Sequence, residues 1–182
     1  SLALTMTAGI FMTLFGIIFS PTILRWIGTP SDVMSSSVLY LRIYFGGILS
    51  VMLYNMGSGI LRAVGDSKNP LYFLIVSSIT NILLDLLFVI VFDMGIAGVG
   101  WATLIAQTIS AVLTLLLLIK TKQEYKVTLK KIRFHKDKLI EIIRLGLPSG
   151  IQNGVVSFSN VIVQSNINAF GSLAMAGCGA YT

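Results

Sequence analysis

The sequence has 182 residues, of which 55% are hydrophobic and only 11% are charged. Water-soluble domains carry about 25% charged residues, so this composition excludes a soluble globular fold and indicates that the chain lies in a lipid bilayer. The net charge is +6, but nine of the thirteen Lys and Arg residues lie between Lys120 and Arg144. A basic block beside apolar runs is typical of a cytoplasmic loop and not of a nucleic-acid-binding surface.

Long apolar runs recur along the chain, each sufficient to cross a hydrocarbon core of roughly 30 Å as a helix. They predict five complete membrane spans, at 2–24, 38–61, 71–92, 96–119 and 147–170, and a sixth that begins at Gly171. We therefore expect an all-α, polytopic transmembrane helix bundle. Because the chain starts with Ser1 and stops inside an apolar stretch, we also expect it to be a fragment of a longer protein.

The charged residues of the loops predict the orientation of these spans. Arg62 and Lys68 lie in one short turn, and the block from Lys120 to Arg144 follows two spans later. Both basic loops therefore lie on one side, which the positive-inside rule makes the cytoplasm. The turn that carries Asp93 then lies outside. Within the basic block, the stretch after Asp137 has helical spacing and predicts an amphipathic helix on the membrane surface.

One acidic residue, Asp85, lies well inside a predicted span. A charged group at a helix centre costs about 2.5–3.5 kcal/mol on insertion scales, and such residues are usually functional. Asn81 precedes Asp85 by four residues and shares its helical face. Thr103 follows the turn near Met94 by as many residues as Asp85 precedes it, so we expect both at the same depth. Together they predict a binding site for a small cation such as Na⁺, or a hydrogen-bonded carboxyl group that takes up a proton.

Other polar residues inside the spans are further candidates. Asn55, with Tyr54 beside it, lies in the second span and closer to the cytoplasm. Gln152, Asn153 and Asn160 recur at near-helical spacing in the fifth span, which predicts a face towards a wet cavity. The alternative for all of these residues is a polar network that only holds helices together. Because the sequence contains no recognisable catalytic triad, metal cluster or phosphate loop, we expect neither an enzyme nor a bound cofactor.

Four runs of sequence resemble the MATE (multidrug and toxin extrusion) family of exporters. The run 61–70, Leu-Arg-Ala-Val-Gly-Asp-Ser-Lys-Asn-Pro, resembles the cytoplasmic turn between the family's fourth and fifth helices. The run 81–85 is similar to the fifth helix, 95–103 to the entry into the sixth, and 146–148 to the opening of the seventh. The resemblance covers nearly the whole chain and implies helices three to seven, and the start of eight, out of twelve.

The resemblance also implies a domain organisation and a function. The family's fold has two six-helix lobes around a central cavity. Residues 1–119 would be four helices of the N-terminal lobe, 120–145 a basic cytoplasmic linker with its amphipathic helix, and 146–182 the start of the C-terminal lobe. The family is a group of secondary antiporters that export organic cations, many of them drugs, in exchange for H⁺ or Na⁺. The resemblance implies a multi-pass protein of a bacterial cell membrane, which works with the rest of the same transporter.

The resemblance assigns roles to some of the polar residues. Asp85, Asn81, Thr103 and Asn55 match the family's cation site in the N-terminal lobe, with no metal implied beyond Na⁺ at Asp85. The family also uses an acidic residue on its first helix, which lies outside this sequence. Tyr54, Gln152, Asn153 and Asn160 remain candidates for the substrate cavity.

Two other functions remain open. A lipid or oligosaccharide flippase of the same superfamily would carry a cavity rich in Arg and Lys, and the absence of a deep Lys in the predicted spans disfavours it. A structural or channel-forming membrane subunit would give no reason for Asp85 and Asn81 to share one helical face.

Overall fold

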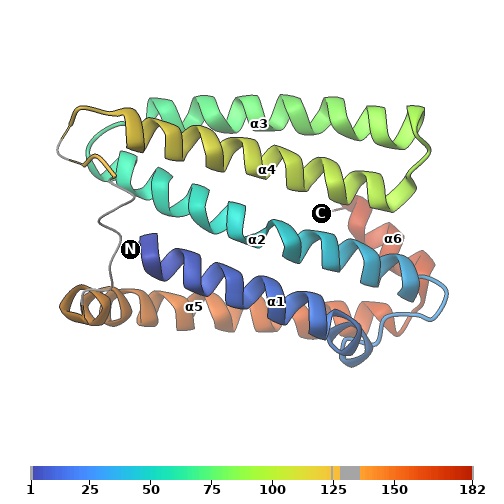
Figure 1. The fold of residues 1–182 in the computed structure, drawn as a ribbon. Helices are drawn as coiled ribbons and strands as arrows, with labels where there is room; N and C mark the ends of the chain where they lie inside the picture. Colours follow the sequence, from blue (N-terminus) through green and yellow to red (C-terminus); the bar gives the residue numbers. More distant parts are fainter. Residues whose placement is uncertain (1, 124, 128–135, 182) are drawn as a thin grey trace. The chain divides into compact units, whose positions relative to one another are not determined.

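The computed structural model describes residues 2–123, 125–127 and 136–181, and the regular structure within them is helical (Figure 1). The helices are α1 (Leu2–Trp26), α2 (Met34–Ala63), α3 (Lys68–Leu86), the π-helix η1 (Leu87–Val91), α4 (Gly95–Lys120), α5 (Lys136–Asn168) and α6 (Ser172–Tyr181). By length and composition, α1, α2, α3 together with η1, and α4 can each cross a membrane. The chain is therefore an all-α bundle of membrane-spanning helices, as the apolar runs predict.

The end of the third predicted span differs from a regular α-helix. After Leu86 the chain continues as a π-helix, in which Phe92 N donates to Leu87 O at 3.1 Å. This π-helical turn begins two residues after Asp85. Single π-turns are rare in proteins and are frequently found at functional sites.

The fifth predicted span is part of a longer helix than the sequence indicates. Helix α5 has 33 residues and passes without a break through the predicted boundary between linker and lobe at 145/146. It is not among the four helices that are apolar enough to be spanning candidates. Its amides and its charged first turns lower its hydropathy. The domain boundaries stay predictions, and residues 124 and 128–135 of the predicted linker lie outside the described residues.

The chain divides into two compact units, each built from segments that are distant in sequence. The first unit combines Ser1–Ile17 with Tyr40–Phe134, and the second combines Ile18–Leu39 with His135–Thr182. In the first unit α3 and α4 form an antiparallel hairpin (Figure 1). This unit contains Asp85, Asn81, Thr103 and Asn55, so the cation site predicted from the sequence falls within one compact unit.

Small residues and hydroxyl groups join α2 to α4 in the first unit. A Cβ atom at Gly57 would overlap Thr114, and one at Gly47 would lie 3.6 Å from Leu104. Ser50 Oγ and Thr108 Oγ1 share a hydrogen bond of 3.1 Å. Close backbone approach and interhelical hydrogen bonds stabilise membrane bundles, since lipid supplies no hydrophobic force between helices.

Arg42 has a structural partner in α1. Pro21 lies inside α1 and lacks the N–H that would bond to the carbonyl of Ile17 in a regular helix. Arg42 Nε of α2 donates to that Ile17 oxygen at 3.3 Å. The arginine thus satisfies a backbone acceptor that the proline leaves without its helical donor, which gives a charged residue near a membrane span a structural role.

The second unit is held near the end of α5 by a buried amide. Asn168 is only 4% exposed, and its Nδ2 donates to Ile27 O at 3.0 Å. Gln164 Nε2 donates to Asn168 Oδ1 at 2.8 Å, so both ends of the Asn168 amide are bonded. In contrast, every side chain of α5 from 141 to 163 is exposed.

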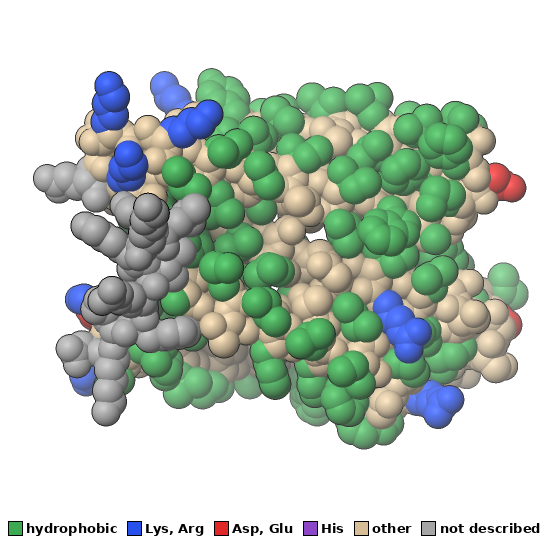
Figure 2. Space-filling model, in the orientation of Figure 1, with side chains coloured by type: hydrophobic (Ala, Val, Ile, Leu, Met, Phe, Trp, Pro, Cys, Tyr) green, Lys and Arg blue, Asp and Glu red, His purple; other side chains and the backbone are tan. Residues whose placement is uncertain are grey.

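The surface of the α3–α4 hairpin has the distribution expected of a membrane protein. Hydrophobic side chains cover its sides, and Lys and Arg side chains gather at the end where α3 begins and α4 ends (Figure 2). Ile82 is 59% exposed and Ile90 is 71% exposed. Such apolar exposure is stable only against lipid or further helices. The basic end is the one that the loop charges assign to the cytoplasm.

Candidate functional site

Three polar side chains follow one face of α3 at four-residue spacing: Ser77, Asn81 and Asp85. Ser77 is 5% exposed, and its Oγ donates to Ala106 O of α4 at 2.7 Å. Because residues four apart share a helical face, this bond indicates that the stripe is directed towards α4. The sequence predicted the shared face of Asn81 and Asp85, and the bond of Ser77 now identifies what that face meets.

Two polar atoms of this stripe are buried without a partner. Asn81 Nδ2 and Asp85 Oδ1 are shielded from solvent, and neither has a hydrogen-bond partner among the described residues. Leaving a buried donor or acceptor unpaired costs about 1–3 kcal/mol, and more when the group is charged. A cation or a proton at Asp85 would compensate Oδ1, whereas Asn81 Nδ2 is a donor and needs an acceptor. The burial of these atoms therefore favours a binding role over a purely structural one.

The depth of Thr103 relative to Asp85 stays a prediction. Across the hairpin, Ser77 meets Ala106, and a Cβ atom at Gly98 would lie 2.9 Å from Phe88. These contacts define the register only near Ser77 and Phe88. Between Asp85 and the turn the chain is π-helical, and a π-turn uses more residues over the same length than an α-helical count assumes.

Thr103 and Asn55 line two different cavities of the first unit. Thr103 belongs to a small cavity of about 100 Å³ between α2 and α4, beside Tyr40 and Tyr44. Asn55 and Tyr54 belong to a larger cavity of about 470 Å³, which we call the main cavity. Val51 and Gln107 line both cavities. The convergence of all four predicted cation-site residues on one point therefore stays a prediction.

The α5 candidates for a substrate cavity lie elsewhere. Gln152, Asn153 and Asn160 are exposed side chains of α5, and they line neither of these two cavities. Tyr54, by contrast, is 7% exposed, and its hydroxyl group donates to Pro70 O at 3.1 Å. Of the four predicted substrate-cavity residues, the structure places Tyr54 in a cavity and leaves the role of the other three as a prediction.

The cavities also contain polar residues that the sequence analysis did not select. Gln107 is an amide inside an apolar span, the same signal that selected Asn55. Ser58 and Arg62 continue from Tyr54 at four-residue spacing on α2, so a helical period could have identified them as one face. All three line the main cavity.

The turn that precedes α3 contains the titratable group that the fold perturbs most clearly. Asp66 accepts hydrogen bonds from Asn69 Nδ2 at 2.6 Å and from the Asn69 backbone N–H at 3.1 Å. These bonds, the side-chain bond first, hold the pKa of Asp66 below its usual value of 3.8. The carboxylate thereby caps the first turn of α3, the helix that positions Asn81 and Asp85.

The donor set around Asp85 suits a proton or a monovalent cation. Across the described residues, no group of three or more His, Cys, Asp and Glu side chains is placed to hold a metal ion. Asp85 contributes a single carboxylate, with amide and hydroxyl groups on neighbouring turns. One negative charge with neutral oxygen ligands matches Na⁺ or H⁺ and gives too little charge for a tightly held divalent ion.

Comparison with known proteins relates this chain to one family of transporters. Residues 1–87 match the MatE family model. Two probable multidrug resistance proteins of Bacillus subtilis (strain 168), YpnP and YoeA, are 35% and 36% identical over 91% and 98% of this chain. A crystal structure of a MATE protein in the bent conformation aligns with a TM-score of 0.79 at 25% identity, over 86% of this chain and 35% of that one. The chain spans 37% and 40% of the lengths of the two Bacillus relatives.

Proposed function

The chain is related to the MATE multidrug efflux transporters in sequence and in fold, and on that premise we propose that it works as part of a secondary antiporter. The whole protein would export organic cations, drugs among them, in exchange for H⁺ or Na⁺. It would act in the cell membrane of a bacterium. The transport cycle would belong to the full-length protein. This chain has four helices that can span a membrane, and they would belong to one lobe, with the rest of the chain beginning the other.

One observation supports the coupling role most directly: Asp85 Oδ1 and Asn81 Nδ2 are buried without partners on the α3 face that meets α4. An ionised carboxylate in these apolar surroundings is stable only when a cation or a proton compensates its charge. The site could therefore alternate between a cation-bound or protonated state and an empty state. This alternation is what an antiporter needs in order to couple two gradients.

The remaining predicted residues have secondary roles in this proposal. Thr103, in the small cavity, and Asn55, in the main cavity, would supply neutral oxygen ligands during part of the cycle. Tyr54 of α2, and separately Gln152, Asn153 and Asn160 of α5, stay predicted contacts of the exported compound. The π-turn after Asp85 supports a site that changes its geometry, since one turn can shift between α and π hydrogen bonding.

The test is the variant Asp85→Asn in the full-length protein. It keeps the size of the side chain and its hydrogen-bonding capacity but removes the charge. We expect normal insertion and expression, with ion-gradient-driven efflux of ethidium reduced to the level of cells that lack the transporter. Efflux is measured at matched expression.

The matched control is Asp93→Asn, which makes the same change in the exposed turn after η1. Asp93 has a φ of +50°, a conformation that Asn also adopts readily. We expect this variant to keep its efflux. Normal gradient-dependent efflux by Asp85→Asn would refute a coupling role for Asp85. Loss of expression of that variant alone would instead identify Asp85 as structural.

A further inference from the structure

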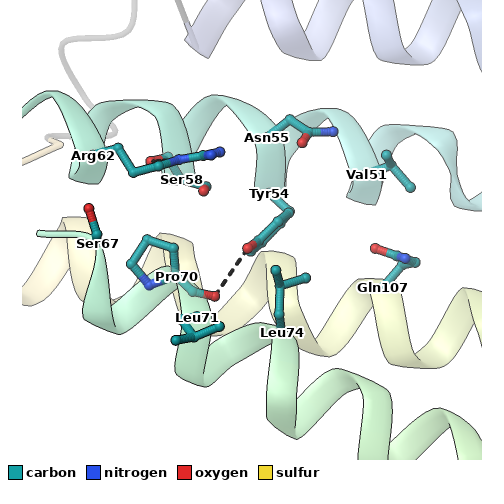
Figure 3. A pocket seen from close by; sticks show the side chains of 10 residues that line it. All are labelled: Val51, Tyr54, Asn55, Ser58, Arg62, Ser67, Pro70, Leu71, Leu74 and Gln107. Carbon is teal, nitrogen blue, oxygen red and sulfur yellow. Dashed lines mark hydrogen bonds between the residues drawn. The ribbon is translucent and has the colours of Figure 1, made fainter.

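The main cavity has a polar side and an apolar side. It has a volume of about 470 Å³ and lies between α2, the start of α3, and α4 (Figure 3). Ser58, Arg62, Asn55 and Gln107 contribute polar groups, and Val51, Leu71 and Leu74 contribute apolar ones. Leu71 and Leu74 are 55% and 43% exposed, so the apolar side extends to the outer surface of the hairpin. A ligand that matches both sides is amphiphilic.

A buried hydroxyl group in this cavity has no partner. Ser58 is 1% exposed, and its Oγ is not hydrogen-bonded within the described part of the chain. Figure 3 shows Ser58 and Tyr54 on the side of α2 that faces α3 across the cavity. Leaving a buried hydroxyl group unpaired is unfavourable, and a ligand with an acceptor oxygen would remove this cost. Ser58 is therefore placed to donate to such a ligand.

The charge of the cavity selects the sign of that ligand. Arg62 is the only charged residue among the ten that line it. Arg62 Nε donates to Ser58 O at 3.3 Å, which holds the arginine stem along α2 on the turn that carries the unpaired hydroxyl group. The terminal guanidinium nitrogens still have donors to offer, and their fork geometry fits the oxygens of a phosphate group.

We propose that the main cavity binds the phosphate group of an anionic ligand, held by Arg62 and Ser58. The apolar side formed by Val51, Leu71 and Leu74 accommodates the body of an amphiphile. This site is separate from the cation site at Asp85 and does not rest on the proposed antiport. Asn55, which the sequence predicts as a cation ligand, also lines this cavity, but its side chain is exposed and the phosphate site does not depend on it.

The experiment measures the thermal unfolding midpoint of the purified full-length protein in a neutral detergent. Dioctanoyl phosphatidic acid and inorganic phosphate are added separately, and dioctanoyl phosphatidylcholine tests the need for net charge. We expect phosphatidic acid to raise the midpoint of the wild type. A rise with phosphatidic acid alone identifies a membrane phospholipid as the source. An equal rise with inorganic phosphate identifies a soluble phosphate compound.

Two variants test the residues, and two matched variants serve as controls. Arg62→Gln and Ser58→Ala should lose the ligand-dependent rise. Lys68→Gln, in the same turn but outside the cavity lining, and Ser78→Ala, on the exposed side of α3, should keep it. Without ligand, Ser58→Ala should be at least as stable as the wild type, because it removes an unpaired buried group. A serine with a purely structural role would give a less stable variant.

Three results would overturn the proposal. The first is a wild type whose midpoint responds to neither phosphate compound. The second is an undiminished rise in Arg62→Gln and Ser58→Ala. The third is an equal response to phosphatidylcholine, whose headgroup has no net charge, since that would show that the apolar side alone binds lipid.

Discussion

Helices α3 and α5 carry the same kind of sequence pattern and meet different surroundings. Each has amide or acidic side chains at near-helical spacing within a longer helix: Asn81 and Asp85 in α3, and Gln152, Asn153 and Asn160 in α5. In α3 the stripe meets α4 and leaves two polar atoms buried and unpaired. In α5 the three amides are exposed. The spacing of polar residues identifies a polar helix face. The neighbouring helix determines whether polar atoms on that face are buried without a partner, and only then does binding a ligand lower the free energy.

The largest expected effect separates the two stripes by function. Asn81→Leu in the full-length protein should abolish the dependence of efflux on the coupling-ion gradient, because it removes the amide beside Asp85. Its stability should stay the same or rise, since the unpaired Nδ2 is removed with it. Efflux is measured against the imposed ion gradient, and stability is measured by thermal unfolding in detergent.

The matched variant in α5 is Asn160→Leu. We expect it to keep the ion dependence and to change only the apparent KM for the exported compound, as a residue of a substrate cavity would. An equal loss of ion dependence in both variants would remove the distinction between the stripes. Unchanged ion dependence in Asn81→Leu would exclude Asn81 from the coupling site.

A smaller effect concerns the packing of the same two regions. Gly57→Val in α2 should destabilise the protein by roughly 1–3 kcal/mol, because its side chain would overlap Thr114 of α4. Gly154→Val in α5 meets no atom within 4 Å and should leave stability unchanged. Unfolding curves of the two full-length variants provide the measurement. Similar losses in both would show that α5 is packed as tightly as α2, although its side chains from 141 to 163 are exposed in this structure.

The sequence predicts the membrane helices well because a bilayer imposes a strong constraint. A spanning segment must satisfy its own backbone, so long apolar runs identify α1 to α4 within a few residues. The shared face of Asn81 and Asp85 follows from the helical period alone. The depth of Thr103 relative to Asp85 stays a prediction, because counting residues from the turn assumes α-helical rise through Leu87–Val91, where the chain is a π-helix. No local feature of that apolar run predicts a π-turn.

Contacts between helices are the part that the sequence does not predict. In the sequence, Arg42 is a charged residue near the end of a span, and no neighbouring residue indicates that it donates a hydrogen bond to Ile17 O. Ser58 resembles any small residue of a membrane helix until its unpaired hydroxyl group is found in a cavity with Arg62. Both contacts depend on the register between neighbouring helices, and hydrophobic periodicity determines only which face of a helix is apolar.

The smallest expected effect concerns Asp66, in the turn before α3. The bonds from Asn69 keep the pKa of Asp66 below 3.8, so the ionised form is favoured in the folded state. A lowered pKa contributes stability that is present above pH 3.8 and is lost as the pH falls below it. Asp66→Asn should therefore lower stability at pH 7 by roughly 0.3–1 kcal/mol, the range for a charge at a helix N-terminus.

The pH dependence distinguishes this cap from a simple loss of packing. The difference in unfolding midpoint between wild type and Asp66→Asn should shrink as the pH is lowered from 7 to 3, because the wild-type carboxylate becomes protonated. Asn69→Ala removes the shorter of the two hydrogen bonds and keeps the backbone N–H, so its own difference from the wild type should shrink partly over the same range. A difference that stays constant with pH would mean that the charge of Asp66 does not stabilise α3. In that case the α3 stripe would depend on its packing against α4 alone.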